Sequence, residues 1–296
     1  MSRRLLKIVI FIFCLFAPGV KGIAFPLPPE IKSVATYILI NNEGKLLPNG
    51  TGFFVGLKNP SKKNNFSVYL VTAKNVLCPP GTTQLLDQIY LLLTKKEGGS
   101  EAVSLTLRLQ GEKKNVFLHP DPIVDLAVMP VLPDRTRYDL KYIPDEYLLT
   151  KEASTNLIIH EGTEVFFPSL FLPYTGAGEM YSCVRLGSFA LVTDKKIEWQ
   201  GKPTALYLIE TGSYGGNNGA PVFFYSESNP ASRGQPALKL AGVMQGTFGD
   251  APQEIKIIEK RKKAIPFSNV GFSAVIPAYK LYEILFSEEL KRQRGF

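Results

Sequence analysis

Residues 215–223 have the sequence GGNNGAPVF, and the interpretation of the whole chain depends on this stretch. Glycines stand on both sides of two asparagines, and Pro221 then begins an apolar run of strand length. Glycine adopts left-handed backbone conformations and allows close approach of another chain segment, so the pattern predicts a tight loop that leads into a β-strand. The residue that such a loop presents at its centre is Asn218, whose side chain is a carboxamide.

Short β-branched and aromatic runs occur along the chain on both sides of this loop. Each run has the length of a strand and is bounded by Gly, Pro, Asn or Lys, which is typical of all-β sandwiches and barrels. Six runs precede a polar, proline-containing region at about 133–156, and six follow it. After Pro277, apolar residues recur at helical spacing, which predicts a C-terminal amphipathic helix.

The pattern predicts an all-β protein made of two six-stranded antiparallel β-barrels and a C-terminal α-helix. We expect a signal peptide over 1–22, the first barrel over 23–135, an interdomain linker over 136–160, and the second barrel with the helix over 161–296.

The first 22 residues have the composition of a secretory signal peptide. A positively charged start precedes an apolar segment over 8–17 that is too short for a comfortable membrane span, and small residues near Gly22 suit cleavage. We therefore expect an exported protein, either periplasmic or secreted. A retained membrane anchor is the alternative.

The formal net charge of +8 is only weak evidence for an anionic partner. Arg3, Arg4, Lys7 and Lys21 belong to the predicted signal peptide, and their loss leaves +4. The basic cluster at 259–263 is interpreted as a solvated loop, and no nucleic-acid-binding motif accompanies it. We expect no nucleic-acid partner.

Two cysteines and two histidines remain after the predicted signal peptide. Cys78 and Cys183 permit one disulfide but are far apart in sequence, so the paired and the free state both stay open. His119 and His160 belong to no cluster with metal-ligand spacing, and we expect neither a metal nor a cofactor. Each histidine is interpreted as a residue of a turn at the surface.

Three segments, in this order, carry the functional signal: YLVTAKNVL at 69–77, VDLAV at 124–128 and GNNGAP at 216–221. With the glycine-rich segment 50–56 and the segment 271–277, the chain resembles the trypsin/chymotrypsin-like serine peptidases, most closely their bacterial members. Each segment alone is a weak signal, and the order of all five carries the resemblance. It covers nearly the whole mature chain and implies two barrels with a cleft between them.

The mechanism of that family needs a hydroxyl nucleophile, an imidazole base and a carboxylate that orients the imidazole. The resemblance places Asp125 at the carboxylate position, Asn75 at the histidine position and Asn218 at the nucleophile position. A carboxamide is not a base near neutral pH and its nitrogen is a poor nucleophile. The resemblance therefore implies a degenerate member, a pseudoprotease without an intact catalytic triad. We expect the Asn75 amide to donate a hydrogen bond to Asp125.

The resemblance also implies a backbone site that resembles an oxyanion hole, formed by the N–H groups of Gly216 and Asn218. Such a site would hold a carbonyl or carboxylate without cleaving anything. The implied pocket and cleft positions are Gly212, Ser213, Met244, Gln245 and Gly246. Gly212 brings no charge to the pocket base, Gly246 is expected to leave the pocket mouth open, and Met244 is expected where the family has a serine that supports the aspartate.

These observations favour an exported, catalytically inactive homologue of trypsin-like serine peptidases that binds a peptide or protein in the cleft as a binding or scaffold module. An active endopeptidase with a non-standard catalytic residue is one alternative, and a subunit whose partner supplies the function is another. No replacement nucleophile is convincing. Cys78 has no imidazole beside it in the sequence, and Ser213 lies in the segment expected to line the pocket.

Overall fold

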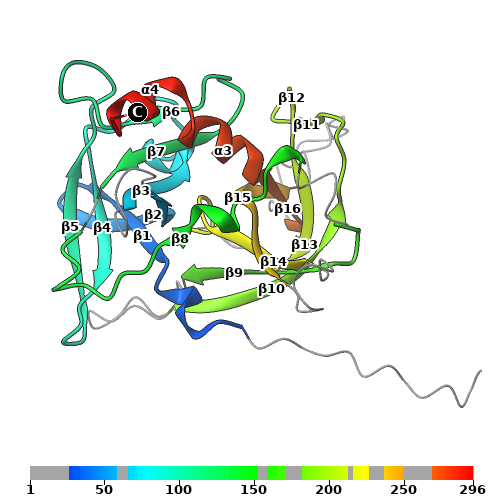
Figure 1. The fold of residues 1–296 in the computed structure, drawn as a ribbon, viewed down its shortest axis with the longest axis horizontal. Coiled ribbons are helices and arrows are strands. Elements are labelled where there is room, and N and C mark those ends of the chain that lie inside the picture. Colours follow the sequence, from blue (N-terminus) through cyan, green and yellow to red (C-terminus); the bar gives the residue numbers. More distant parts are fainter. Residues whose placement is uncertain are drawn as a thin grey trace, which may run out of the picture.

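The computed structural model describes residues 27–58, 66–131, 133–152, 159–170, 182–212, 216–226, 237–249 and 269–295. The predicted signal peptide, Ser213 and the basic cluster at 259–263 lie outside these residues. The described chain is mainly β. Figure 1 shows two β units side by side, the first at the left and the second at the right, with the C-terminal helices along the top.

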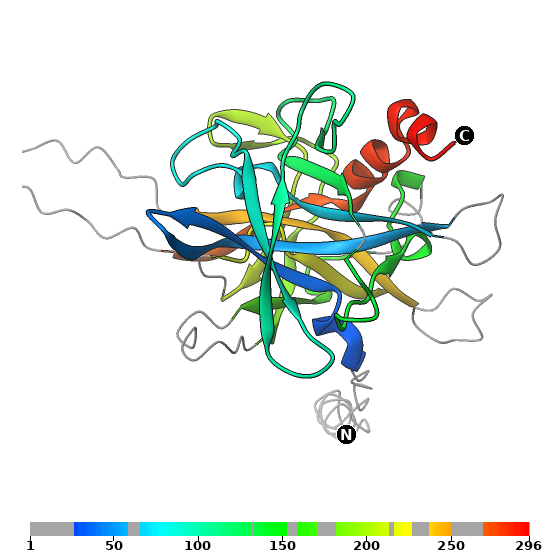
Figure 2. The ribbon, with the colours of Figure 1, turned by 90° about the vertical axis from the view of Figure 1, so that its left-hand side faces the viewer.

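The first unit is one sheet of eight strands in the order β5-β4-β1-β2-β3-β7-β6, with β8 paired to β2. All its pairings are antiparallel except that of β8 with β2. In Figure 2 this unit faces the viewer. Its strands are β1 (Ala35–Asn42), β2 (Lys45–Lys58), β3 (Phe66–Ala73), β4 (Gln88–Thr94), β5 (Ser100–Thr106), β6 (Phe117–Leu118), β7 (Leu126–Pro130) and β8 (Ile143–Pro144).

The expected closure of this first unit into a six-stranded barrel is not seen among its described strands. The edge strands β5 and β6 pair with different neighbours, and β6 is only two residues long. The chain between them turns back on itself instead, because the N–H groups of Asn115 and Val116 both donate to the carbonyl of Arg108.

The second unit is a closed six-stranded barrel, as predicted, in the order β10-β13-β16-β15-β14-β9. A separate two-stranded hairpin, β11 with β12, projects from it. The strands of this half are β9 (Glu164–Leu170), β10 (Ser182–Leu191), β11 (Ile197–Trp199), β12 (Lys202–Thr204), β13 (Tyr207–Thr211), β14 (Pro221–Ser226), β15 (Ala237–Gly249) and β16 (Asn269–Pro277).

Short helices connect and end the β units. The 3-10 turns are η1 (Pro29–Lys32), η2 (Lys74–Leu77) and η3 (Asp145–Tyr147), and the α-helices are α3 (Ala278–Leu285) and α4 (Glu288–Gln293). Helix α3 begins directly after Pro277 and buries Ala278, Leu281, Ile284 and Leu285, which recur at helical spacing. Each of the larger side chains contributes about 1.5–3 kcal/mol on full burial.

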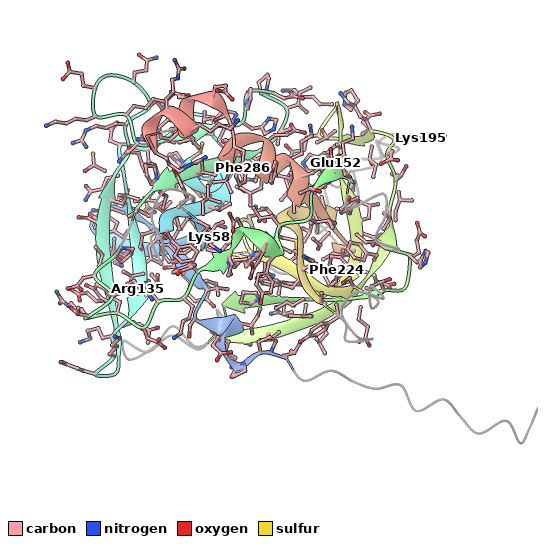
Figure 3. The ribbon with its side chains drawn as sticks, in the orientation of Figure 1. Lys58, Arg135, Glu152, Lys195, Phe224 and Phe286 are labelled. Carbon is pink, nitrogen blue, oxygen red and sulfur yellow. The ribbon has the colours of Figure 1, made fainter. Side chains whose placement is uncertain are left out.

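One hydrophobic core extends across both units. Its members include Phe53 and Val128 of the first unit together with Val222 and Phe224 of the second, all at most 1% exposed. Figure 3 shows Phe224 among the strands of the second unit. A second cluster, which includes Leu91, belongs to the first unit alone. The two units are therefore held together by shared apolar packing, which places the surface between them in a fixed arrangement.

The described part of the segment expected as an interdomain linker, 136–152 and 159–160, contacts both units. Tyr138 and Leu140 are buried in the cluster of the first unit, and β8 pairs with β2. Leu148 then forms a bridge with Leu240 of the second unit. Part of this segment is therefore core.

Candidate functional site

Asp125 and Asn75 are brought together by the pairing of β3 with β7. Ala73, the last residue of β3, lies opposite Leu126, the first residue of β7. Asn75 therefore follows one strand, in η2, where Asp125 precedes the other. Asp125 Oδ1 accepts a hydrogen bond from the backbone N–H of Asn75 at 2.9 Å, and its carbonyl accepts one from Lys74 N–H at 3.1 Å.

A hydrogen bond joins Asn75 to Asp125, but its donor is the backbone N–H, so the expected donation from the Asn75 amide is wrong. The Asn75 amide is directed toward β15, where Nδ2 lies 3.5 Å from the carbonyl oxygen of Gln245. Asn75 Oδ1 is buried and has no hydrogen-bond partner among the described residues.

The surroundings of Asp125 raise the pKa of its carboxyl group. Burial raises the pKa of this carboxyl above its usual value of 3.8, and the Asn75 N–H and the Lys74 charge lower it by smaller amounts. No imidazole of the described chain contacts Asp125.

The loop at 216–219 is held between strands β2 and β15. Gly219 has φ of +85°, and a Cβ atom there would collide with the carbonyl oxygen of Thr51 and with Thr72 Oγ1. Thr51 Oγ1 donates to the carbonyl of Gly216 at 2.7 Å, and Gly219 N–H donates to the carbonyl of Met244 at 2.7 Å. The loop is tight, as predicted, and glycine is required at position 219 because other backbone segments approach it closely.

Asn218 lies at the centre of this loop and is half-buried. Its carbonyl accepts from Thr51 N–H at 2.8 Å, and its Oδ1 lies beside Gly246 of β15. Gly216 N–H and Asn218 N–H donate to no acceptor in the described part of the chain. These are the two N–H groups expected to form the site that resembles an oxyanion hole.

Two residues that the sequence patterns did not single out support the loop from the second barrel. Ser169 of β9 donates from Oγ to Oδ1 of the buried Asn217 at 2.5 Å, and Arg185 of β10 donates from Nε to Ser169 Oγ at 3.1 Å. A second guanidinium nitrogen of Arg185 donates to the carbonyl of Gly212 at 2.9 Å. The pocket-base position Gly212 is uncharged, as expected, but a cation lies beside it.

The mouth expected to be open at Gly246 is covered by Trp199 of β11. A Cβ atom on Gly246 would lie 3.3 Å from the indole of Trp199, so the ring occupies the space beside this glycine. Trp199 is 7% exposed and meets Phe248 edge to face, with 4.5 Å between ring centroids. An aromatic ring is thus supplied from a hairpin distant in sequence.

Gln245, and not Met244, is the residue of β15 that lies beside Asn75. Gln245 lines a cavity together with Asn75 and Asp125, whereas Met244 is fully buried in the core shared by both units. The expectation that Met244 stands beside Asp125 was therefore wrong by one residue. A one-residue shift along a strand moves a side chain to its other face.

The cavity beside Asp125 has a volume of about 380 Å³. It lies where the two units meet, because its walls come from η2, the approach to β7, the β11–β12 hairpin and β15. The side chains that matter most for its chemistry are Lys74, Asn75, Asp125, Trp199, Lys202 and Gln245.

His119 is not a surface residue, because it is buried beside helix α3. Its Nδ1 accepts from Asp121 N–H at 3.0 Å, and its Nε2 lies 3.1 Å from a carboxylate oxygen of Glu283. Burial lowers the pKa of His119, although the nearby Glu283 carboxylate raises it. Both ring nitrogens are engaged away from Asp125. His160 is exposed, as expected for a turn.

Cys78 and Cys183 are free thiols. Cys78 lines the cavity, and its Sγ lies 3.6 Å from the carbonyl of Lys74. Burial raises the pKa of the Cys78 thiol, and the negative charge of Asp125 adds to this effect. A thiol held protonated is a poor nucleophile.

Among the described residues, no group of three or more His, Cys, Asp or Glu side chains is placed to hold a metal ion. No helix within those ranges has the length and hydropathy needed to cross a bilayer.

Comparison with solved structures gives similar folds at low sequence identity. The MamO protease domain of Magnetospirillum magneticum matches with a TM-score of 0.52 and 14% identity, over 88% of this chain and 100% of that chain. Rv3671c of M. tuberculosis, in an inactive serine-to-alanine form, matches with a TM-score of 0.43 and 15% identity, over 88% of this chain and 95% of that chain. A tobacco etch virus protease mutant matches with a TM-score of 0.47 and 11% identity, over 90% and 83%.

The sequence itself matches no protein-family model and no curated protein. The likeness to the MamO protease domain therefore shows the fold alone. On that evidence, the chain has the fold of the chymotrypsin-like proteases.

Proposed function

We propose that this chain is an exported, catalytically inactive homologue of trypsin-like serine peptidases, which binds a peptide or protein in the cleft between its two β units. The observation that carries the proposal is the environment of Asp125. Its carboxylate accepts a hydrogen bond from the Asn75 backbone, and carboxamides stand at the base and nucleophile positions.

The lost chemistry is that of proton transfer and bond formation. Without an imidazole, no group takes a proton from a nucleophile at neutral pH, and the Asn218 amide offers no activated oxygen. The loop backbone keeps the Gly216 and Asn218 N–H groups, which suit a carbonyl or carboxylate of a bound peptide. Binding without hydrolysis follows from this combination.

An active hydrolase with another nucleophile has less support. The Cys78 thiol has a raised pKa, no imidazole of the described residues bonds to it, and both ring nitrogens of His119 are engaged elsewhere. Each substitute thus lacks a partner that would activate it.

The test is an activity assay on the mature protein with a fluorescent casein substrate and a fluorophosphonate probe. We expect neither turnover nor covalent labelling. Asn218→Ser alone should remain inert because it restores a hydroxyl without a base, and Asn75→His with Asn218→Ser supplies both groups. Turnover or stoichiometric labelling of the wild-type chain would contradict the proposal.

The binding part of the proposal is tested with a displayed random peptide library. We expect selected peptides to bind the wild-type chain and to lose affinity when Gly216→Trp blocks the cleft at the loop. Selected peptides that bind both proteins equally would contradict a site in the cleft.

Export is tested by fusing residues 1–26 to an alkaline phosphatase that lacks its own signal. We expect phosphatase activity outside the cytoplasm of a bacterial host and cleavage near Gly22. A fusion that stays inactive and uncleaved would contradict this part of the proposal.

A further inference from the structure

Three buried polar atoms without a hydrogen-bond partner belong to side chains around the cavity beside Asp125. They are Asn75 Oδ1, Gln245 Oε1 and Trp199 Nε1, and they make up half of the six such side-chain atoms in the described part of the chain. Buried polar groups are nearly always paired, so three unpaired groups on side chains that line one cavity point to a ligand that pairs them once these side chains turn toward the cavity.

The groups that carry these atoms are held in place by the fold. Gln245 is 5% exposed on β15, and its carbonyl oxygen lies 3.5 Å from the Asn75 amide nitrogen. Trp199 is fixed by its packing on Phe248 and Gly246.

The hairpin that presents Trp199 has a tight and defined turn. Trp199 pairs with Lys202, and the two residues between them, Gln200 and Gly201, have φ of +50° and +74°. Two positive φ angles in a two-residue loop are the geometry of a type I′ turn, which fits the twist of the strands. In Figure 3, Lys195 marks the chain just before this hairpin.

The charges around the cavity favour a neutral ligand group. Lys74 and Lys202 bring two positive charges and Asp125 brings one negative charge. The excess of positive charge disfavours an ammonium group, and the acceptor oxygens of Asn75 and Gln245 together with the Asp125 carboxylate disfavour a carboxylate.

We propose that this cavity binds a primary carboxamide, the side chain of a glutamine or asparagine in a bound peptide. The amide NH₂ donates to Asn75 Oδ1 and Gln245 Oε1, and the amide carbonyl accepts from Trp199 Nε1–H. This matches two acceptors and one donor with a single neutral group. The volume of about 380 Å³ lies in the range of small-ligand pockets. The inference rests on the proposed function, because the peptide is the ligand proposed for the cleft.

The experiment uses Trp199 as its reporter, because it is the only tryptophan of the chain. Its indole N–H gives a single resonance in a ¹⁵N-labelled sample. The probes are three peptides, acetyl-Ala-Gln-Ala-N-methylamide and its counterparts with Glu or Met at the centre, so that only the glutamine peptide carries a primary carboxamide. We expect the glutamine peptide to shift the indole proton downfield and to bind about tenfold more tightly than either counterpart, as for a lost buried hydrogen bond.

Two variants separate the hydrogen bonds from the packing. Gln245→Met removes Oε1 at similar side-chain length and should weaken the glutamine peptide about tenfold while leaving the methionine peptide unchanged. Gln88→Met, at the exposed first residue of β4, is the matched control and should change neither affinity. Should Gln245→Met fail to fold, Trp199→Phe measured by calorimetry replaces it, because it keeps the ring and removes only the indole N–H.

The outcomes distinguish this inference from the proposed function. Equal affinity for the three peptides overturns carboxamide recognition and leaves peptide binding intact. An indole resonance that does not move with the glutamine peptide at millimolar concentration also overturns it. The proposed function is decided separately, by the casein, fluorophosphonate and displayed-library assays on the same protein.

Discussion

At the scale of single residues, Gly219 shows how tightly the loop is constrained. It combines a left-handed backbone with close contacts to Thr51 and Thr72, and its N–H donates to Met244. Only glycine combines this left-handed backbone with room for Thr51 and Thr72. The shape of the loop therefore depends on Gly219 and not on the side chain of Asn218.

We expect Gly219→Ala to destabilise the protein by about 3 kcal/mol or more, since left-handed strain and overpacking add. Gly162→Ala is the matched control, because Gly162 has φ of +88° but open space around it, and it should cost only about 1–2 kcal/mol. Urea unfolding measures both free energies. Equal losses in the two variants would show that the contacts with Thr51 and Thr72 contribute nothing.

Asp125 gives a prediction for pH dependence. Burial raises its pKa in the folded state above 3.8, so the folded state binds the proton more tightly than the unfolded state. The stability that protonated Asp125 contributes is present below its pKa in the unfolded state. It is lost as the pH rises through its pKa in the folded state. Asp125→Asn keeps an oxygen that accepts from Asn75 N–H without the charge, and it should be relatively more favourable at pH 7 than at pH 3.

The difference between the two pH values should be about 1.4 kcal/mol for each unit by which the pKa is raised. Urea unfolding of wild type and variant at both pH values measures it. A variant whose relative stability does not change, or falls, as the pH rises would contradict a raised pKa.

At the scale of elements, Arg294 joins the C-terminal helices to the first unit by hydrogen bonds. Its guanidinium donates to the carbonyl of Leu285, the last residue of α3, at 2.7 Å and to the hydroxyl of Tyr69 in β3 at 3.2 Å. The first bond satisfies a carbonyl that has no partner within the helix, and the second joins the helix to a strand.

Arg294→Met should therefore destabilise the protein by about 1–3 kcal/mol, because two hydrogen bonds to a charged donor are lost. Arg292→Met is the control, since Arg292 is exposed and bonds only within its own helix, and it should stay within about 0.5 kcal/mol of wild type. Thermal unfolding of both variants measures the difference. A loss confined to Arg292→Met would contradict the role given to Arg294.

The second barrel and the loop at 216–219 could be predicted from the sequence because they depend on local patterns. Strand-length runs and glycine spacing report short-range geometry, and β14 begins at Pro221 as expected. The packing of Trp199 over Gly246 and the hydrogen bonds that hold Asn217 could not be predicted. Trp199, Ser169 and Arg185 reach the site through tertiary packing, and no residue near them in sequence signals that contact.

At the scale of the whole molecule, the open sheet and the packed linker have a common explanation. The first unit does not close on itself, but it shares a core with the second unit through Phe53 and Val128. Segment 136–160 adds Tyr138 to the first unit's own cluster and a bridge at Leu148 to the second unit. Sequence periodicity predicted six strands in each half, whereas the described chain has eight in each. It also does not say which edges meet, since that depends on long-range pairing.

A shared core predicts that the two units unfold together. Leu91→Ala removes buried side-chain volume from the cluster that belongs to the first unit alone and should cost about 2–5 kcal/mol. Trp199 fluorescence reports on the second half of the chain, so a cooperative molecule shifts its fluorescence midpoint in urea as far as the circular-dichroism midpoint. Leu109→Ala, at an exposed leucine of the first unit, should move neither. Fluorescence that keeps the wild-type midpoint in Leu91→Ala would show that the units unfold separately and that their common core does not couple them.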